Sequence, residues 1–298
     1  AALAPSTTTA DTTPATGPVT VSHVYGETVI ESLPERIVSL NMQWTDVLTA
    51  LGHSPVAAGV DPFMGDWYPW QHNDNIEKIE IGADNSIPFE LVATYAPDLI
   101  VASWVAGDDA TYATLSAIAP TIPLLGDRTV DPWEEITLTA GEIFGESAAA
   151  EGLLAEADDT AAVLLERHPG LDGKTYALAN YVPGDQIYIV ADPDDGASQL
   201  FAKLGMQIDP ELLALDQGGF GRAELSLENI DQLDADVLLM LTNGADTADI
   251  PGYANLPAVQ TGAVVVMDYP LAVAFNTPTP LSIQYSLDYI GSALEAAA

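Results

Sequence analysis

The feature of this chain that most constrains its fold is one motif that occurs twice, about 138 residues apart. The first copy spans residues 89–101 and the second spans residues 227–239. Each copy reads as a short helix with a glutamate in its first turn, then a turn at Pro97–Asp98 or Ala235–Asp236, then a short apolar strand. Solenoid repeats have periods of about 20–50 residues, so this spacing indicates two similar lobes. We expect two α/β lobes that face each other across a ligand-binding cleft.

Strands alternate with helices in both halves of the chain. In the first half we expect strands at 35–40, 55–60, 98–103 and 121–125, and helices at 43–51, 88–95 and 108–118. In the second half we expect strands at 174–182, 186–190, 235–241 and 263–267, and helices at 195–204, 226–233, 253–259 and 279–295. This alternation predicts an α/β fold with mostly parallel sheets.

Residues 131–168 show no strand pattern, and their apolar side chains follow helical spacing. Gly145 divides the segment into two pieces, and the piece 147–168 would be about 33 Å long as a helix. A helix of that length reaches from one lobe to the other. We therefore divide the chain as follows: a tether at 1–18, an N-terminal lobe at 19–130, an interlobe helical segment at 131–170 and a C-terminal lobe at 171–298.

The charge of the chain excludes several kinds of partner. The formal net charge is −37, with only seven lysines and arginines, so we expect no binding to nucleic acid, which needs a basic surface. Adsorption to an anionic membrane surface is disfavoured for the same reason. The chain contains no cysteine, which excludes disulfides, thiol nucleophiles, zinc fingers and iron–sulfur clusters.

Residues 1–18 are rich in Ser, Thr, Pro and Ala and contain one large aliphatic residue. Such a segment buries too little apolar surface to become ordered, so we expect a flexible tether. No charged and apolar leader precedes it, which is typical of a mature chain whose export signal has been removed. A tether of this kind suits a protein held on a surface, and an ordinary frayed terminus is the alternative.

The sequence contains none of the common catalytic signatures, namely G-x-S-x-G, the phosphate-binding G-x-x-x-x-G-K-[ST], H-E-x-x-H, or G-x-G-x-x-G after a strand. The four histidines are His23, His53, His72 and His168, and no two have the spacing of a metal site. We therefore expect no catalytic residues, no protein-built metal site and no cofactor, and we do not expect an enzyme.

Aromatic residues gather where predicted strands end. In the first half these residues are Trp44, Trp67, Tyr68, Trp70 and Trp104. In the second half they are Tyr181, Phe220, Tyr269 and Phe275. Ligands of parallel α/β sheets bind beyond the carboxyl ends of the strands, so we expect these rings to line loops around a pocket. The alternative is that the rings only plug the ends of the sheets.

Two arginines and two glutamates complete the set of candidate site residues. Arg128 and Arg222 follow or precede predicted elements near the cleft, where a guanidinium could bind anionic oxygens; a surface ion pair is the alternative. Glu90 and Glu228 occupy the same position in the two motif copies. They either cap their helices or dock onto a two-fold symmetric partner that carries Arg or Lys.

The chain resembles the substrate-binding proteins of bacterial ABC importers for ferric siderophores, a family that includes cobalamin and heme binders. The resemblance covers about residues 19–295 and rests on the order and spacing of four segments together with the long helical segment between the lobes. The four segments are Pro34–Leu40, Ala50–Gly52, Glu90–Val101 and Leu225–Leu239.

This resemblance implies two lobes joined by a long helix, with limited lobe movement and a shallow cleft between them. It also implies that Glu90 and Glu228 meet arginines on the permease of the importer. Members of the family are commonly lipoproteins anchored through an N-terminal cysteine, so an anchor of this chain would lie upstream of Ala1. We expect an extracytoplasmic monomer at the cell surface or in the periplasm.

The identity of the ligand does not follow directly from the resemblance. Zinc and manganese relatives bind their metal through histidines and carboxylates, which we do not find in a suitable pattern here. A siderophore supplies its own iron ligands and needs only rings and hydrogen-bond donors, so we expect a ferric siderophore. Heme or a cobalamin-like corrinoid is the alternative within the same importer class. An α/β hydrolase and a surface adhesion or scaffold protein are alternatives of other classes.

Overall fold

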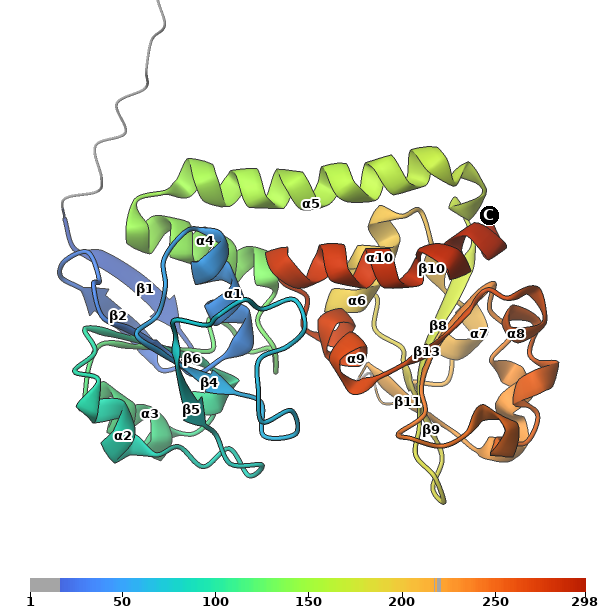
Figure 1. The fold of residues 1–298 in the computed structure, drawn as a ribbon, viewed down its shortest axis with the longest axis horizontal. Helices are drawn as coiled ribbons and strands as arrows, with labels where there is room; N and C mark the ends of the chain where they lie inside the picture. Colours follow the sequence, from blue (N-terminus) through green and yellow to red (C-terminus); the bar gives the residue numbers. More distant parts are fainter. Residues whose placement is uncertain (1–16, 217, 219–220) are drawn as a thin grey trace, which may run out of the picture.

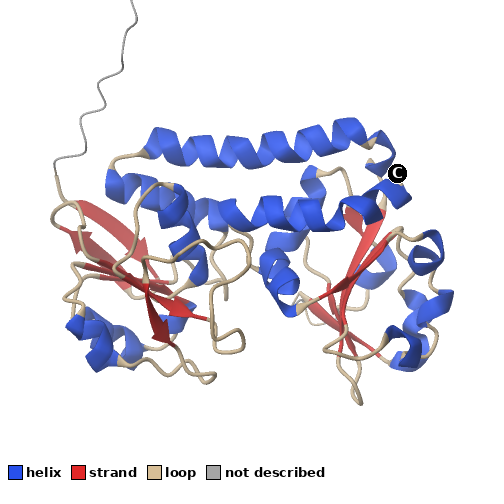
Figure 2. Ribbon diagram, in the orientation of Figure 1, coloured by secondary structure: helices blue, strands red, loops and turns tan. Residues whose placement is uncertain are grey.

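The computed structural model describes residues 17–216, 218 and 221–298. They form two α/β lobes that lie side by side beneath one long helix (Figure 1). Of the tether expected at 1–18, all but the last two residues lie outside the described part of the chain, and so does Phe220. In each lobe a sheet packs against helices, as Figure 2 shows.

The N-terminal lobe is built on a parallel sheet of five strands in the order β5-β4-β3-β6-β7. The strands are β3 (Ile37–Ser39), β4 (Ala57–Val60), β5 (Glu77–Glu80), β6 (Leu99–Ser103) and β7 (Thr121–Pro123). An antiparallel hairpin of β1 (Val19–His23) and β2 (Gly26–Ile30) precedes them. Strand β6 is buried along its whole length, as expected for a strand covered on both faces of a parallel sheet.

Helices cover both faces of this sheet. They are α1 (Met42–Ala50), α2 (Phe89–Thr94), α3 (Asp109–Ser116) and α4 (Trp133–Phe144), with a short 3₁₀ helix η1 (Trp104–Ala106). One apolar core contains Trp44 of α1 and Ile136 of α4. A second core contains Val92 of α2 and Leu115 of α3. The carboxyl ends of the strands are left to the loops that form the site.

Helix α5 (Ser147–Arg167) joins the two lobes. Its first half packs on α4, where Gly141 allows close approach because a Cβ there would lie 2.6 Å from the Cβ of Ala150. Its second half contributes Ala157 and Ala161 to the core of the C-terminal lobe. Gly145 ends α4 in the left-handed region, with φ of 69°. The expected break at this residue and the expected long joining helix are confirmed.

The C-terminal lobe contains a mixed sheet in the order β11-β9-β8-β12-β13, with β10 paired to β8. The strands are β8 (Thr175–Tyr181), β9 (Ile187–Val190), β10 (Gln207–Ile208), β11 (Arg222–Leu225), β12 (Val237–Leu241) and β13 (Val264–Met267). Strand β9 runs antiparallel to both β8 and β11, and the other pairs are parallel. The α/β fold with mostly parallel sheets in two lobes is therefore confirmed.

The helices of the C-terminal lobe are α6 (Gly196–Lys203), α7 (Pro210–Leu213), α8 (Pro257–Thr261), α9 (Tyr269–Asn276) and α10 (Pro280–Ala297). Short 3₁₀ helices are η2 (Pro169–Leu171), η3 (Leu227–Gln232), η4 (Thr247–Asp249) and η5 (Tyr253–Asn255). The second motif copy was expected to begin with an α-helix, but η3 is a kinked 3₁₀ helix with non-helical backbone at Asn229. Among the described residues no helix is both long and apolar enough to cross a membrane.

The lobes touch through a small apolar cluster. Tyr68 and Trp70 of the N-terminal lobe pack against Ala274 of α9, with Tyr285 of α10 at the edge. The rings of Tyr68 and Trp70 stack with their centroids 4.7 Å apart. Helix α10 also packs on α1 and α5. These contacts place α9 and the start of α10 directly at the interface between the lobes.

Candidate functional site

Three cavities share residues of α9; two of them lie between the lobes, and the third lies within the C-terminal lobe. Asn276, the last residue of α9, lines all three. The first has a volume of 280 Å³ and lies at the carboxyl ends of β3, β4 and β6. The second has a volume of 820 Å³ and contains both candidate arginines. The third, of 120 Å³, lies against β8 and β9. We call them the aromatic cavity, the arginine cavity and the strand cavity.

The aromatic cavity is closed by side chains from both lobes. Trp104 and Tyr68 line it from the N-terminal lobe, and Tyr269 and Val273 line it from α9 of the C-terminal lobe. Phe63 stands at its edge with 72% of its surface exposed and contacts the ring of Tyr269 edge-on at 5.8 Å. This combination of an apolar wall with hydroxyl groups suits a small organic ligand.

Asp61 is the acidic residue that organises this cavity. Its carboxylate accepts hydrogen bonds from the hydroxyls of Tyr68 and Tyr269, at 2.8 and 3.0 Å, and so connects the two lobes. The other carboxylate oxygen accepts from the backbone N–H groups of Phe63 and Met64. Burial and the nearby Asp61 charge raise the pKa of Tyr68, and they raise the pKa of Tyr269 to about 12. Both phenols therefore remain donors at neutral pH.

The arginine cavity is lined by Arg128 and Arg222, but both guanidiniums already have acceptors. Arg222 Nη2 lies 2.7 Å from a carboxylate oxygen of Asp195, and its Nη1 donates to the backbone oxygen of Gly221. Arg128 Nη1 lies 3.5 Å from the backbone oxygen of Asp194. Arg222 therefore forms an ion pair, which was the alternative to binding an anionic ligand in the sequence analysis. The two arginines do share one cavity, as the sequence suggested.

Asp46 of α1 is fully buried beside the cavities and holds a second connection between the lobes. It accepts hydrogen bonds from Trp70 Nε1 at 2.8 Å, from Gln71 Nε2, and from the Thr279 hydroxyl at 2.7 Å. Thr279 is the N-cap of α10 in the C-terminal lobe. Burial raises the pKa of Asp46 to about 6, although these hydrogen bonds oppose the shift.

The structure corrects the placement of several predicted site residues. Trp44 was expected to line the pocket, but it lies inside α1, within the helix expected at 43–51, and is fully buried in the core. Its backbone N–H is held by the Asn41 side chain, the N-cap of the helix. Tyr269 and Phe275 were expected in loops, but both belong to α9. Phe275 is buried and forms part of the wall of the strand cavity.

The other predicted rings divide between the site and its surroundings. Tyr68, Trp104 and Tyr269 line the aromatic cavity. Trp70 and Tyr181 are buried and do not line the three cavities. Trp67 lies outside them, with the Lys78 ammonium 5.6 Å from its ring. Arg222, which was expected to precede a predicted element near the cleft, begins strand β11.

Glu90 and Glu228 are both exposed, in the first turns of α2 and η3. Neither lines a cleft cavity. Strand β11 runs parallel to β8, because each is antiparallel to β9. Glu228 therefore follows the carboxyl end of its sheet. Asn85 of the aromatic cavity precedes Glu90 by five residues, so both glutamates lie in helices that begin on the carboxyl-end side of the strands.

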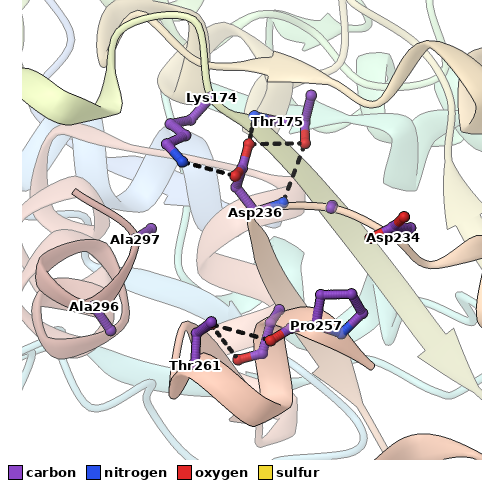
Figure 3. A pocket seen from close by; sticks show the side chains of 10 residues that line it. Lys174, Thr175, Asp234, Asp236, Pro257, Thr261, Ala296 and Ala297 are labelled. Atoms are coloured by element: carbon purple, nitrogen blue, oxygen red, sulfur yellow. Dashed lines mark hydrogen bonds and ion pairs between the residues drawn. The ribbon is translucent and has the colours of Figure 1, made fainter. Parts of the chain in front are cut away.

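A pocket of 240 Å³ lies at the opposite, amino ends of β8 and β12 (Figure 3). Asp236 in this pocket accepts hydrogen bonds from Lys174 Nζ and from the backbone N–H of Thr175, both at 2.9 Å. These groups are paired with each other, so they fix the start of strand β8. The pocket is remote from the interlobe cavities and is not part of the candidate site.

Comparisons with known proteins agree with this architecture. Residues 37–271 match the model of a family described as periplasmic binding protein. A periplasmic solute-binding protein of Mycobacterium smegmatis has a crystal structure that superimposes with a TM-score of 0.77. It is 28% identical and covers 95% of this chain and 99% of its own.

The names of two relatives state what those proteins bind. The probable siderophore-binding lipoprotein YfiY of Bacillus subtilis is 29% identical over 235 residues, which are 77% of this chain and 70% of the relative. The ferric enterobactin-binding periplasmic protein FepB of Escherichia coli is 26% identical over 272 residues, 84% of each chain.

Proposed function

This chain belongs to the periplasmic binding protein family, and on that premise we propose that it captures a ferric siderophore between its lobes for an ABC importer. We propose that the two lobes span residues 19–130 and 171–298 and that the helical segment 131–170 joins them. Members of this family are binding proteins that deliver a solute to a permease, and the chain acts as a binding protein in this scheme.

The aromatic cavity supports this function most directly. Its walls come from the strand ends of one lobe and from α9 of the other, so a bound molecule would touch both lobes at once. A siderophore surrounds ferric iron with its own oxygen ligands, so the protein needs ring faces and hydroxyl groups instead of metal ligands. Trp104, Tyr68 and Tyr269 provide these groups. The relatives named for siderophore binding favour the same ligand class.

Delivery to the permease is the role that we propose for Glu90 and Glu228. One exposed carboxylate lies on each lobe, at the carboxyl-end side of its sheet, and does not line the cleft cavities. Helix α2, which carries Glu90, lies on the side of the N-terminal lobe remote from α5 (Figure 1). Two matched acids at a fixed separation suit a pseudo-symmetric partner that carries arginines.

We propose an extracytoplasmic location, on the cell surface or in the periplasm. The Bacillus relative is named a lipoprotein and the Escherichia relative a periplasmic protein. Attachment through a lipid anchor is part of this proposal. The monomeric state is also proposed, and size-exclusion chromatography with light scattering tests it.

Tryptophan fluorescence tests the ligand class, because Trp104 lies in the aromatic cavity. The purified protein is titrated in turn with ferric hydroxamates, catecholates and citrate, and with heme and cobalamin. Saturable quenching by at least one ferric chelate, absent with the iron-free chelator at equal concentration, supports the proposal. Binding of heme or cobalamin alone would replace the siderophore with the alternative ligand class. Ester or glycoside hydrolysis above the no-protein control would point to the enzyme alternative.

A further inference from the structure

The charged groups around the cleft are mainly acidic. Among the described residues that line the three cavities, the acidic ones are Asp61, Asp131, Glu134, Asp192, Asp194 and Asp195. The basic ones are Arg128 and Arg222. Carboxylates therefore outnumber guanidiniums three to one, and the chain as a whole carries a formal charge of −37. A ligand that enters the cleft meets a negative potential.

Of the two arginines, Arg222 offers little free positive charge to a ligand. The guanidinium of Arg222 is held by Asp195, whose side chain is only 10% exposed and is fixed as the N-cap of α6. Arg128 donates to the neutral backbone of the same acidic loop, at Asp194, and so keeps its charge, but it shares its cavity with five carboxylates. To pair with Arg222, an anionic ligand would have to displace the Asp195 carboxylate or lie beside it. Both alternatives reduce the affinity for an anion.

In the aromatic cavity the uncompensated charge is that of Asp61. The carboxylate is held by two tyrosine hydroxyls and two backbone N–H groups. These donors are neutral, so they orient the carboxylate but leave its negative charge in place. Among the described residues lining this cavity there is no lysine or arginine. Asp61 therefore attracts a cation and repels an anion.

Given the proposed siderophore function, we infer that the cleft selects ferric complexes that are neutral or positively charged. Three hydroxamates neutralise ferric iron, and a free amine on the same molecule makes such a complex cationic. Three catecholates bring twice as much negative charge and leave the complex strongly anionic. The structure thus points to a ferric trihydroxamate, with its amine directed towards the Asp61 side of the aromatic cavity.

A series of ligands with one shape and different charge tests this inference. Ferric desferrioxamine B has a free amine; its N-acetyl derivative is neutral, and its N-succinyl derivative carries a carboxylate. We expect affinity in the order amine, acetyl, succinyl, with a change of about tenfold per unit charge, equivalent to about 1.4 kcal/mol. The differences should shrink when the salt concentration is raised from low to high. A ferric tricatecholate should bind more weakly than all three.

Two nearly isosteric variants identify the responsible charges. Asp61→Asn keeps the size of the side chain and removes the charge, so the preference for the amine over the succinyl complex should fall about tenfold. Asp195→Asn keeps an effective N-cap for α6 and releases Arg222, so binding of the succinyl complex should improve. Far-ultraviolet circular dichroism and thermal unfolding establish that each variant is folded. If one variant does not fold, the other still tests the same charge effect.

The outcomes separate this inference from the function on which it rests. Equal binding of the three derivatives, or tightest binding of the anionic complexes, overturns the charge preference and leaves the siderophore function standing. No binding of any ferric complex overturns both. An unchanged preference in both folded variants also overturns the inference, because the selectivity would then come from groups other than Asp61 and Asp195.

Discussion

The carboxylate of Asp46 accepts a hydrogen bond of 2.7 Å from the hydroxyl of Thr279, which ties helix α1 of one lobe to the start of α10 of the other. Both residues are completely buried. Together with the bond from Tyr269 to Asp61, this contact holds the lobes to each other at two points. The arrangement favours a cleft of nearly fixed width, in which the ligand meets a preformed wall.

Asp46 should make stability depend on pH in a specific way. Burial raises its pKa from 3.8 to about 6, so between these values the folded protein binds a proton that the unfolded chain has released. The contribution of Asp46 to folding stability is therefore highest below this window and is lost as the pH rises through it. The loss is about 3 kcal/mol for a shift of this size.

Asp46→Asn is the matched control, because its amide does not titrate. Urea unfolding of both proteins at about pH 4 and about pH 7 gives the free energy of unfolding at each pH. We expect the wild type to lose about 3 kcal/mol relative to the variant between the two conditions. A stability difference that is the same at both pH values would show that Asp46 does not titrate in this window.

Trp104 should dominate the fluorescence response to ligand. It lines the aromatic cavity, so Trp104→Phe should remove most of the quenching and weaken binding by about tenfold, or about 1.4 kcal/mol. Trp67→Phe is the control, since Trp67 lies outside the cavity beside Lys78. Calorimetry measures affinity independently of the fluorophore. Full quenching in Trp104→Phe would place the ligand elsewhere.

The aspartate in the turn of each motif copy should matter for stability and not for binding. Asp98 accepts hydrogen bonds from the backbone N–H groups of Glu35 and Arg36, just before β3, and Asp236 accepts from Thr175 at the start of β8. Asp236→Ala leaves the backbone N–H of Thr175 without this acceptor and should lower the free energy of unfolding by about 1–3 kcal/mol. The exposed neighbour Asp234 provides the control, Asp234→Ala. Thermal unfolding and ligand titration of both variants measure the two effects separately.

The elements that the sequence predicted well have strong, continuous apolar runs. Strands β6 and β12 are buried along almost their whole length, and their composition alone identifies them. Strand β5 was missed because only Ile79 of its four residues is buried. Helix α9 was missed because its short sequence is apolar on all sides and has no helical periodicity.

The site was harder to predict than the fold, because its contacts join residues far apart in the chain. Tyr68 and Tyr269 were identified from their aromatic character, but Asp61 was one of 44 acidic residues without a distinguishing pattern. Its role depends on Tyr269, which is 208 positions away. Trp44 could have been placed correctly, because it falls within the helix expected at 43–51, and Asn41 is a strong N-cap signal that starts this helix before the ring.

Glu90 and Glu228 should be required for uptake and not for ligand binding. Both are exposed and lie outside the three cleft cavities, so Glu90→Gln combined with Glu228→Gln should leave affinity unchanged. Two exposed ion pairs with a permease contribute about 1 kcal/mol together, so uptake at limiting protein should fall about fivefold. Added salt should weaken the wild-type complex with the permease, because exposed charge pairs are screened.

A matched double variant on helix α5 separates docking from general loss of negative charge. Glu151 and Glu166 are exposed on α5, which lies on the side of the molecule opposite α2 (Figure 1). Glu151→Gln with Glu166→Gln should therefore transport normally. If Glu90 and Glu228 only stabilise their helix termini, their replacement should lower the free energy of unfolding by a few tenths of a kcal/mol and leave uptake intact. Normal uptake by the Glu90 and Glu228 double variant at native expression would assign them this capping role.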